Sequence, residues 1–137
     1  YDEGLRKKYK QIEDREQRWE AIETGDADII LVVYGTSARI CKRAVKMGRA
    51  QGIRLGLIRP VTLWPFPFQA FRQVRDTAQA FLSVEMSAIG QMVEDVALAV
   101  KGKAPVHVYT AGMVPPKEQR ILTMAREILD GKLEEVF

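Results

Sequence analysis

The most constraining feature of the sequence is an unbroken apolar run, DIILVVY at residues 28–34. A strand with one face in water alternates polar and apolar side chains, whereas a run without alternation is typical of a strand covered on both faces. Such strands belong to parallel sheets that carry helices on each side. The run therefore predicts a buried parallel strand and a fold of the α/β class.

The rest of the chain repeats a strand followed by a helix. Three further strands are predicted at residues 54–58, 80–85 and 106–110. The first helix is expected to begin after Ser37 and to reach about residue 51, with Gly48 where its backbone approaches the sheet closely. Four such units predict a three-layer, doubly wound, mostly parallel sheet of about four strands. Inward-facing positions are expected in the first helix (Ile40, Ala44, Met47), in a helix opening at Pro67 (Phe68, Phe71, Val74), after Gly90 (Val93, Val96, Ala97, Val100) and after Pro115–Pro116 (Ile121, Leu122, Ala125, Ile128, Leu129).

Length and charge distribution suggest one domain preceded by a short charged segment. The 137 residues suit one compact domain and leave little room for a second. Residues 1–25 interleave charges with a thin apolar stripe, which predicts a solvated helix or linker, and residues 26–137 are expected to form the α/β domain. The chain begins at Tyr1 rather than methionine, which suggests a fragment of a longer subunit.

The composition argues against several classes of partner. The net charge of +3 and the pI near 9.1 are mildly basic, but the basic residues are spread among acidic ones. Because a nucleic-acid surface requires a basic stripe, we expect no nucleic-acid partner. No apolar run approaches the ~18 residues of a bilayer span, so no membrane partner is expected. A single cysteine, Cys41, excludes an intrachain disulfide and a cysteine-cluster metal site, and it favours a cytoplasmic location.

One candidate site is the turn Gly35-Thr36-Ser37, between the first strand and its helix. Free backbone N–H groups at a helix N-terminus favour an anion, so a phosphorylated ligand could bind there. The turn is not a G-x-G-x-x-G or a G-x-x-x-x-G-K-[ST] motif, and a simple turn with a helix N-cap is the favoured interpretation. The alternative function that follows is a free-standing α/β module binding a phosphorylated small ligand.

The remaining reactive residues do not form a catalytic set. Glu85 ends a strand without a second acid or a histidine to pair with it in sequence, so a structural role or a subunit contact is expected. His107, the only histidine, lies within a strand, and Cys41 lies within a helix without an activating partner. No metal-ligand spacing occurs. We therefore predict no catalytic residue and no metal site.

Several motifs in one order resemble a known family. The segments YGTSAR, GLIRPVTLWPFP, VEMSAIGQMVEDV and VYTAGMVPPKEQRIL are similar to the C-terminal, transketolase-like part of the α subunit of 2-oxoacid:ferredoxin oxidoreductases. The resemblance runs from about residue 26 to 129 and is strongest to the enzymes for 2-oxoisovalerate or 2-oxoglutarate. The connection at residues 86–89 departs from the expected length, so no role is transferred to it.

The resemblance implies a role inside a larger enzyme of anaerobic metabolism. Such complexes decarboxylate a 2-oxoacid oxidatively to an acyl-CoA, using thiamine diphosphate, Mg²⁺ and iron–sulfur clusters, and pass electrons to ferredoxin. The implied partners are the N-terminal thiamine domain of the same subunit and the other subunits, with coenzyme A and ferredoxin serving the whole complex. No cofactor is expected in this fragment, which is predicted to be a non-catalytic assembly domain.

A proline-aromatic segment at residues 56–71 suggests how assembly occurs. Its three prolines, Pro60, Pro65 and Pro67, stiffen a loop and reduce the entropy lost on docking. Large aromatics are the anchors that interface cores favour. The alternative is that Trp64, Phe66 and Phe68 cover the sheet end within the domain. The predicted docking residues are Arg59, Trp64, Phe66, Glu85 and Gln91.

Overall fold

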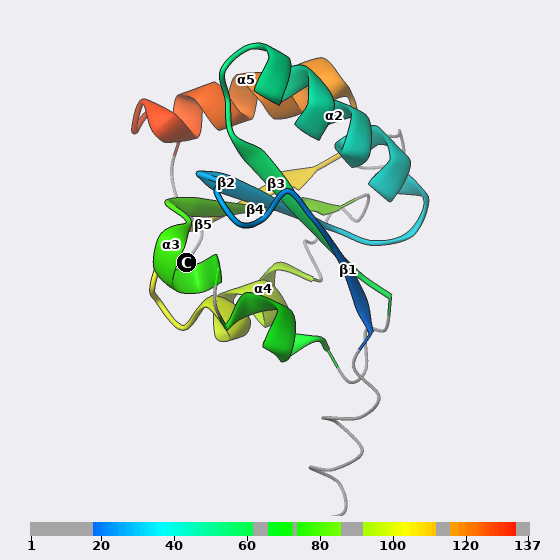
Figure 1. The fold of residues 1–137 in the computed structure, drawn as a ribbon, viewed down its shortest axis with the longest axis vertical. Helices are drawn as coiled ribbons and strands as arrows, with labels where there is room; N and C mark the ends of the chain where they lie inside the picture. The colour runs from blue at the N-terminus through cyan, green and yellow to red at the C-terminus, as the bar shows by residue number, and fades with distance from the viewer. Residues whose placement is uncertain (1–17, 62–65, 73, 86–91, 112–115, 134–137) are drawn as a thin grey trace, which may run out of the picture.

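The computed structural model describes residues 18–61, 66–72, 74–85, 92–111 and 116–133. At its centre lies a five-stranded sheet with the order β1-β3-β2-β4-β5 (Figure 1). Strands β3, β2, β4 and β5 are parallel, and β1 is antiparallel to β3. The strands are β1 (Trp19–Ile22), β2 (Ile29–Val33), β3 (Leu55–Pro60), β4 (Ala80–Glu85) and β5 (Val106–Thr110).

The edge strand β1 is the main departure from the predicted fold. Residues 19–22 were expected within a charged helix or linker, and instead they pair with β3, from Trp19 opposite Pro60 to Ile22 opposite Leu57. Strand β3 also includes Pro60, beyond the predicted end of that strand. Proline is tolerated there because the register of β3 with β2 ends at Ile58, and on the β1 side the next N–H, that of Val61, donates to the Arg18 carbonyl.

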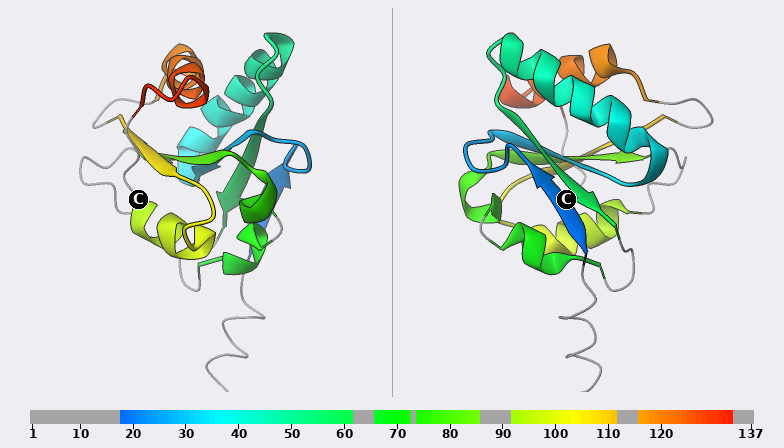
Figure 2. Two further views of the ribbon diagram at one scale, coloured as in Figure 1. Left: turned by 90° about the vertical axis from the view of Figure 1, so that its left-hand side faces the viewer. Right: turned by 45° about the vertical axis from the view of Figure 1, so that its right-hand side comes forward.

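Helices cover both faces of the sheet, as the doubly wound prediction requires. In Figures 1 and 2, α2 and α5 lie on one face, and α3 and α4 lie on the other. The helix expected to open at Pro67 begins as a 3₁₀ turn, η2, which leaves Phe68 partly exposed and buries Phe71. The helices are α2 (Ala38–Ala50), η2 (Phe68–Phe71), α3 (Val74–Thr77), α4 (Val93–Val100) and α5 (Glu118–Leu129).

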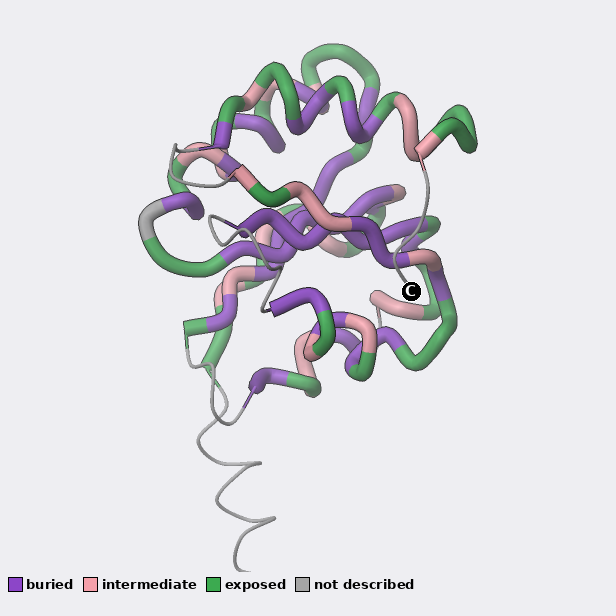
Figure 3. Tube along the Cα trace, turned by 180° about the vertical axis from the view of Figure 1, so that it is seen from behind, coloured by how far each residue is buried: buried purple, intermediate pink, exposed green. Residues whose placement is uncertain are grey.

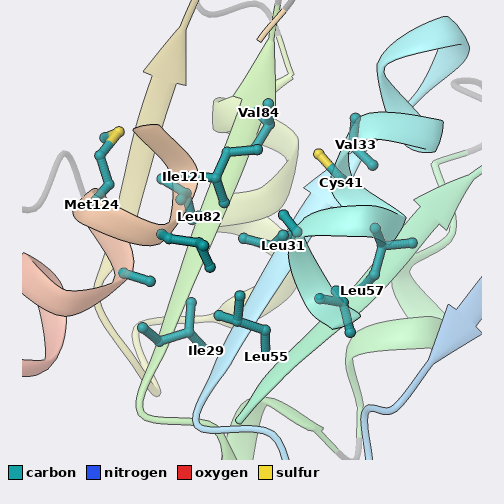
Figure 4. Packing of buried hydrophobic residues seen from close by; sticks show 14 of the residues in the cluster. Ile29, Leu31, Val33, Cys41, Leu55, Leu57, Leu82, Val84, Ile121 and Met124 are labelled. Carbon is teal, nitrogen blue, oxygen red and sulfur yellow. The ribbon is translucent and has the colours of Figure 1, made fainter. Parts of the chain in front are cut away.

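Two apolar cores, one on each face of the sheet, explain the DIILVVY run. Leu31 points to the face covered by α2 and α5, where it lies near Leu55, Leu82 and Cys41 (Figure 4). Its neighbours Ile30 and Val32 belong to the opposite core, with Phe71, Phe81 and Val96. All five residues of β2 are buried, and the purple trace through the middle of Figure 3 follows the buried strands. The prediction of a strand covered on both faces is confirmed.

The topology identifies the end of the sheet where a ligand would bind. From β2 the chain crosses α2 to reach β3 on one side, and it later returns to β4 on the other side of β2. The connections therefore diverge at β2, which makes the carboxyl ends of β2 and β4 the topological switch point. Open α/β sheets bind ligands in the crevice at such a point.

Candidate functional site

The turn Gly35–Ser37 (η1) follows directly after β2, at the switch point. Gly35 has a φ of +73°, a left-handed conformation that favours glycine. Ser37 is buried at the N-cap position of α2, but its side chain makes no capping hydrogen bond. The turn is therefore present where predicted, without the predicted side-chain cap. Whether it binds an anion stays a prediction.

A basic pocket opens beside this turn. It has a volume of about 660 Å³ and lies between the end of β2, the first half of α2 and the penultimate residue of β3. Three of its cationic side chains come from α2 and the fourth from β3, because the N-terminal half of α2 adjoins the carboxyl end of β3. The lining residues are Gly35, Ala38, Arg39, Ile40, Lys42, Arg43 and Arg59.

Two carboxylates partly neutralise the basic pocket. Glu20 of β1 accepts from Arg59 Nε at 2.9 Å and pairs with Lys42 Nζ at 3.0 Å through the same oxygen. The hydrogen bonds from Lys42 and Arg59 hold the pKa of Glu20 below its ordinary value. Arg43 Nε pairs with Glu118 at 3.2 Å. Arg59 remains about one-third exposed, so it is still accessible as a docking residue.

Glu85 does not lie on the surface, which corrects its assignment as a docking residue. Its side chain is 2% exposed, and Oε1 accepts a hydrogen bond from the backbone N–H of Met92, just before α4. Ser83 Oγ donates to Oε2 at 3.3 Å. A carboxylate at this position satisfies an N–H group that the helix leaves unpaired. Glu85 therefore joins the end of β4 to the start of α4.

Phe66 also lies inside the domain, which corrects its assignment as a docking residue. It is 4% exposed, and its ring stacks on Phe71 with centroids 5.8 Å apart. Phe71 in turn packs against Phe81 of β4. For Phe66, the alternative that the aromatics cover the sheet within the domain describes the structure. Trp64 and Gln91 lie outside the described residues.

Three accessible apolar side chains, which were not among the predicted docking residues, lie on or beside the elements described above. Trp19 is 38% exposed at the start of β1, and Val61 is 56% exposed just after β3. Phe68, assigned to an inner helix face, is 39% exposed and meets the Phe66 ring edge-on at 5.4 Å. The register of Trp19 opposite Pro60 places the first two at one end of the β1–β3 ladder. Only this pairing with β3, which is long-range, reveals Trp19 as a candidate.

The described residues do not fit a metal or an iron–sulfur cluster. No group of three or more histidine, cysteine, aspartate or glutamate side chains comes together among them. Cys41 is fully buried, and burial, with a smaller contribution from Glu118, raises the pKa of its thiol to about 12. His107 is buried within β5. None of the described helices is long and apolar enough to cross a membrane.

Known proteins are similar in sequence to this chain over most of its length. Residues 27–120 match the family model "Pyruvate:ferredoxin oxidoreductase core domain II". The chain is 47% identical over 95 residues to the ketoisovalerate oxidoreductase subunit VorB of Methanothermobacter thermautotrophicus, covering 69% of this chain and 27% of that subunit. It is 39% identical over 95 residues to the 2-oxoglutarate synthase subunit KorA of Methanothermobacter marburgensis, covering 69% and 24%. The chain thus spans about a quarter of the length of these relatives.

Solved structures show the same fold. The 2-oxoglutarate:ferredoxin oxidoreductase from Magnetococcus marinus superposes with a TM-score of 0.71 at 20% identity, covering 86% of this chain and 21% of that one. A split-gene transketolase, an inactive β4 tetramer, superposes with a TM-score of 0.67 at 19% identity, covering 85% and 42%. The transketolase match shows a shared fold. The chain belongs to the core domain II family of pyruvate:ferredoxin oxidoreductase, within the 2-oxoacid:ferredoxin oxidoreductases.

Proposed function

We propose that this chain is an assembly domain of a cytoplasmic, thiamine-dependent 2-oxoacid:ferredoxin oxidoreductase whose substrate is 2-oxoisovalerate. The observation that carries the choice of substrate is the higher identity to the ketoisovalerate subunit, 47% against 39% for the 2-oxoglutarate subunit over stretches of equal length. The complex would convert the 2-oxoacid to an acyl-CoA and pass the electrons to ferredoxin. Thiamine diphosphate, Mg²⁺ and the clusters would be held by other domains and subunits.

The chemistry of the side chains in this chain supports a non-catalytic role. Iron–sulfur clusters need several cysteine thiolates, and the sequence has one cysteine, with a buried thiol. Glu85, the acid at the switch point, is occupied by Ser83 and the Met92 N–H. The described groups are therefore suited to packing and docking, while the cofactor chemistry needs ligands from elsewhere.

The corner formed by β1 and the end of β3 is the docking surface that we favour. It exposes Trp19 and Val61, and Arg59 lies beside them with one-third of its side chain accessible. Aromatic and arginine side chains are the residues in which interface energy concentrates. The occupant we propose is the thiamine-binding domain of the same subunit, in keeping with a chain that spans about a quarter of its relatives' length.

The test of the substrate is a comparison of 2-oxoacids on a purified complex that contains this chain. Coenzyme A-dependent reduction of a viologen dye would be measured with 2-oxoisovalerate, 2-oxoglutarate and pyruvate. The proposal predicts the highest kcat/KM for 2-oxoisovalerate. A higher value for 2-oxoglutarate would contradict the choice of substrate while leaving the assembly role intact.

A further inference from the structure

Helix α2 carries an unusual distribution of charge. Its sequence, ARICKRAVKMGRA, contains five basic residues and no acidic one, and Arg39 lies in the first turn. The N-terminus of a helix carries a partial positive charge, which favours anions there and disfavours cations. A cation in the first turn without an acidic neighbour on the helix is therefore unfavourable unless an anion comes from outside the helix.

The acidic residues of the domain do not supply enough negative charge. Of the four cations that line the basic pocket, Lys42 and Arg59 share the single carboxylate of Glu20, and Arg43 pairs with Glu118. Within the described part of the chain, Arg39 forms no ion pair. Four cations against two carboxylates leave two positive charges in excess.

The shape and place of the pocket favour a small ligand. Its volume of about 660 Å³ falls in the range of roughly 300–1,000 Å³ found for small-molecule sites. It adjoins Gly35 at the carboxyl end of β2, the edge of the sheet where ligands of this fold class bind. A concave pocket suits a small anion better than it suits the flat acidic surface of another protein.

We propose that the basic pocket binds the phosphate group of a small molecule, with Arg39, Arg43 and Arg59 as its charged contacts. Guanidinium groups are the side chains best matched to phosphate, because their fork of N–H donors bonds two oxygens at once. Glu20 competes with the ligand for Arg59 and Lys42, since its carboxylate already occupies both cations. The site shares Arg59 with the proposed docking surface, but binding at the site requires neither the other subunits nor the 2-oxoacid, so it can be measured independently of assembly.

The test uses the 137-residue chain and inorganic pyrophosphate as the probe, by isothermal titration calorimetry at low ionic strength. The proposal predicts saturable binding at one site per chain. Arg39→Gln and Arg43→Gln should each weaken binding about tenfold, because a hydrogen bond to a charged group is worth about 1.5 kcal/mol or more. Lys46→Gln is the matched control, since it removes the same charge from an exposed position of α2 outside the pocket, and it should change affinity less than about twofold.

A substitution that strengthens binding distinguishes a ligand-binding role of the pocket residues from a purely structural one. Glu20→Gln should tighten pyrophosphate binding, whereas Glu127→Gln on α5 should leave it unchanged. Circular dichroism of each variant identifies any that fails to fold. Arg39→Lys, which keeps the charge but loses the fork of N–H donors, should bind more tightly than Arg39→Gln and more weakly than the unchanged chain. Absence of saturable binding, or equal weakening by Arg39→Gln and Lys46→Gln, would overturn the proposal. Neither result would affect the assembly role, which is measured on the complex.

Discussion

Arg59 and Glu20 face each other across the β1–β3 ladder, and Arg59 Nε donates to Glu20 Oε1 at 2.9 Å. Lys42 of α2 reaches the same oxygen at 3.0 Å. One carboxylate therefore joins the antiparallel edge strand to its neighbour and to the helix above the sheet. Since β1 is four residues long, this triad adds a side-chain link to the backbone bonds that hold the strand in place.

The Glu20 triad predicts a stability difference that depends on pH. Lys42 and Arg59 hold the pKa of Glu20 below its ordinary value of 4.5, so its stabilising effect is complete above that value and is lost as pH falls through the lower pKa of the folded state. Because the pair is partly exposed, Glu20→Gln should cost only about 0.5–1 kcal/mol at pH 7. Urea unfolding at pH 7 and at pH 3 measures this, and an equal cost at both values would contradict the prediction.

The burial of Phe66 predicts contrasting effects for two neighbouring aromatics. Phe66→Ala should reduce the free energy of unfolding by about 3–5 kcal/mol, because it leaves a cavity against Phe71 in the core. Phe68→Ala is the matched control and should cost about 1 kcal/mol or less, since its ring is 39% exposed. Urea unfolding of the isolated chain compares the two. A larger loss for Phe68→Ala would show that the core assignment is wrong.

Substitution by alanine is predicted to be less well tolerated at Gly56 than at Gly48. In β3, a Cβ on Gly56 would lie 2.8 Å from the carbonyl oxygen of Glu23 and 2.8 Å from Ala27 Cβ. Because that oxygen belongs to the backbone, Gly56→Ala should cost about 1–3 kcal/mol of stability. In α2, a Cβ on Gly48 would lie 2.7 Å from the flexible end of Leu55, which confirms the predicted close approach of helix and sheet.

Gly48→Ala therefore serves as the comparison for Gly56→Ala. The gain in helix propensity, about 1 kcal/mol, offsets part of the cost of moving the Leu55 side chain. Thermal unfolding of both variants should show the larger drop in Tm for Gly56→Ala. The reverse order would mean that the backbone around Glu23 adjusts more readily than the core beneath α2.

Cys41 is predicted to be unreactive in the folded chain. With a pKa of about 12 and complete burial, only about one thiol in ten thousand would be ionised at pH 8. A thiol-specific disulfide reagent should therefore react at the rate at which the chain unfolds, and urea should accelerate the reaction strongly. Stoichiometric labelling within minutes in the absence of denaturant would contradict this.

Local sequence patterns predicted those parts of the fold whose signal is local. The strands at Ala80–Glu85 and Val106–Thr110 match the predicted ranges, since each is an apolar segment between turn residues. Strand β1 was missed because WEAI does not alternate clearly and its position depends on pairing with a strand some 35 residues later. The same limit applies to the site. Gly35 could be found from the turn, but the arrangement of Glu20 between Arg59 and Lys42 depends on that unpredicted strand.

The burial of individual side chains near loops also could not be predicted from the sequence. Phe66 and Phe68 are separated by one proline, and one is buried while the other is partly exposed. A helical repeat starting at Pro67 predicted that both Phe68 and Phe71 face inward, but in the 3₁₀ turn that forms there Phe71 is buried and Phe68 is partly exposed. Glu85 was predicted at the end of a strand, where it lies. Its enclosure depends on Met92, after a connection whose form the sequence did not specify.

The assembly role is tested most directly by sedimentation velocity of the 137-residue chain, first alone and then mixed with the thiamine-binding domain of its proposed subunit and the other subunits. The account predicts that the chain sediments with them as one complex, that 2-oxoisovalerate-dependent dye reduction requires the chain, and that Trp19→Ala weakens the association without unfolding the chain. A chain that sediments apart, beside subunits that are fully active without it, would contradict the account.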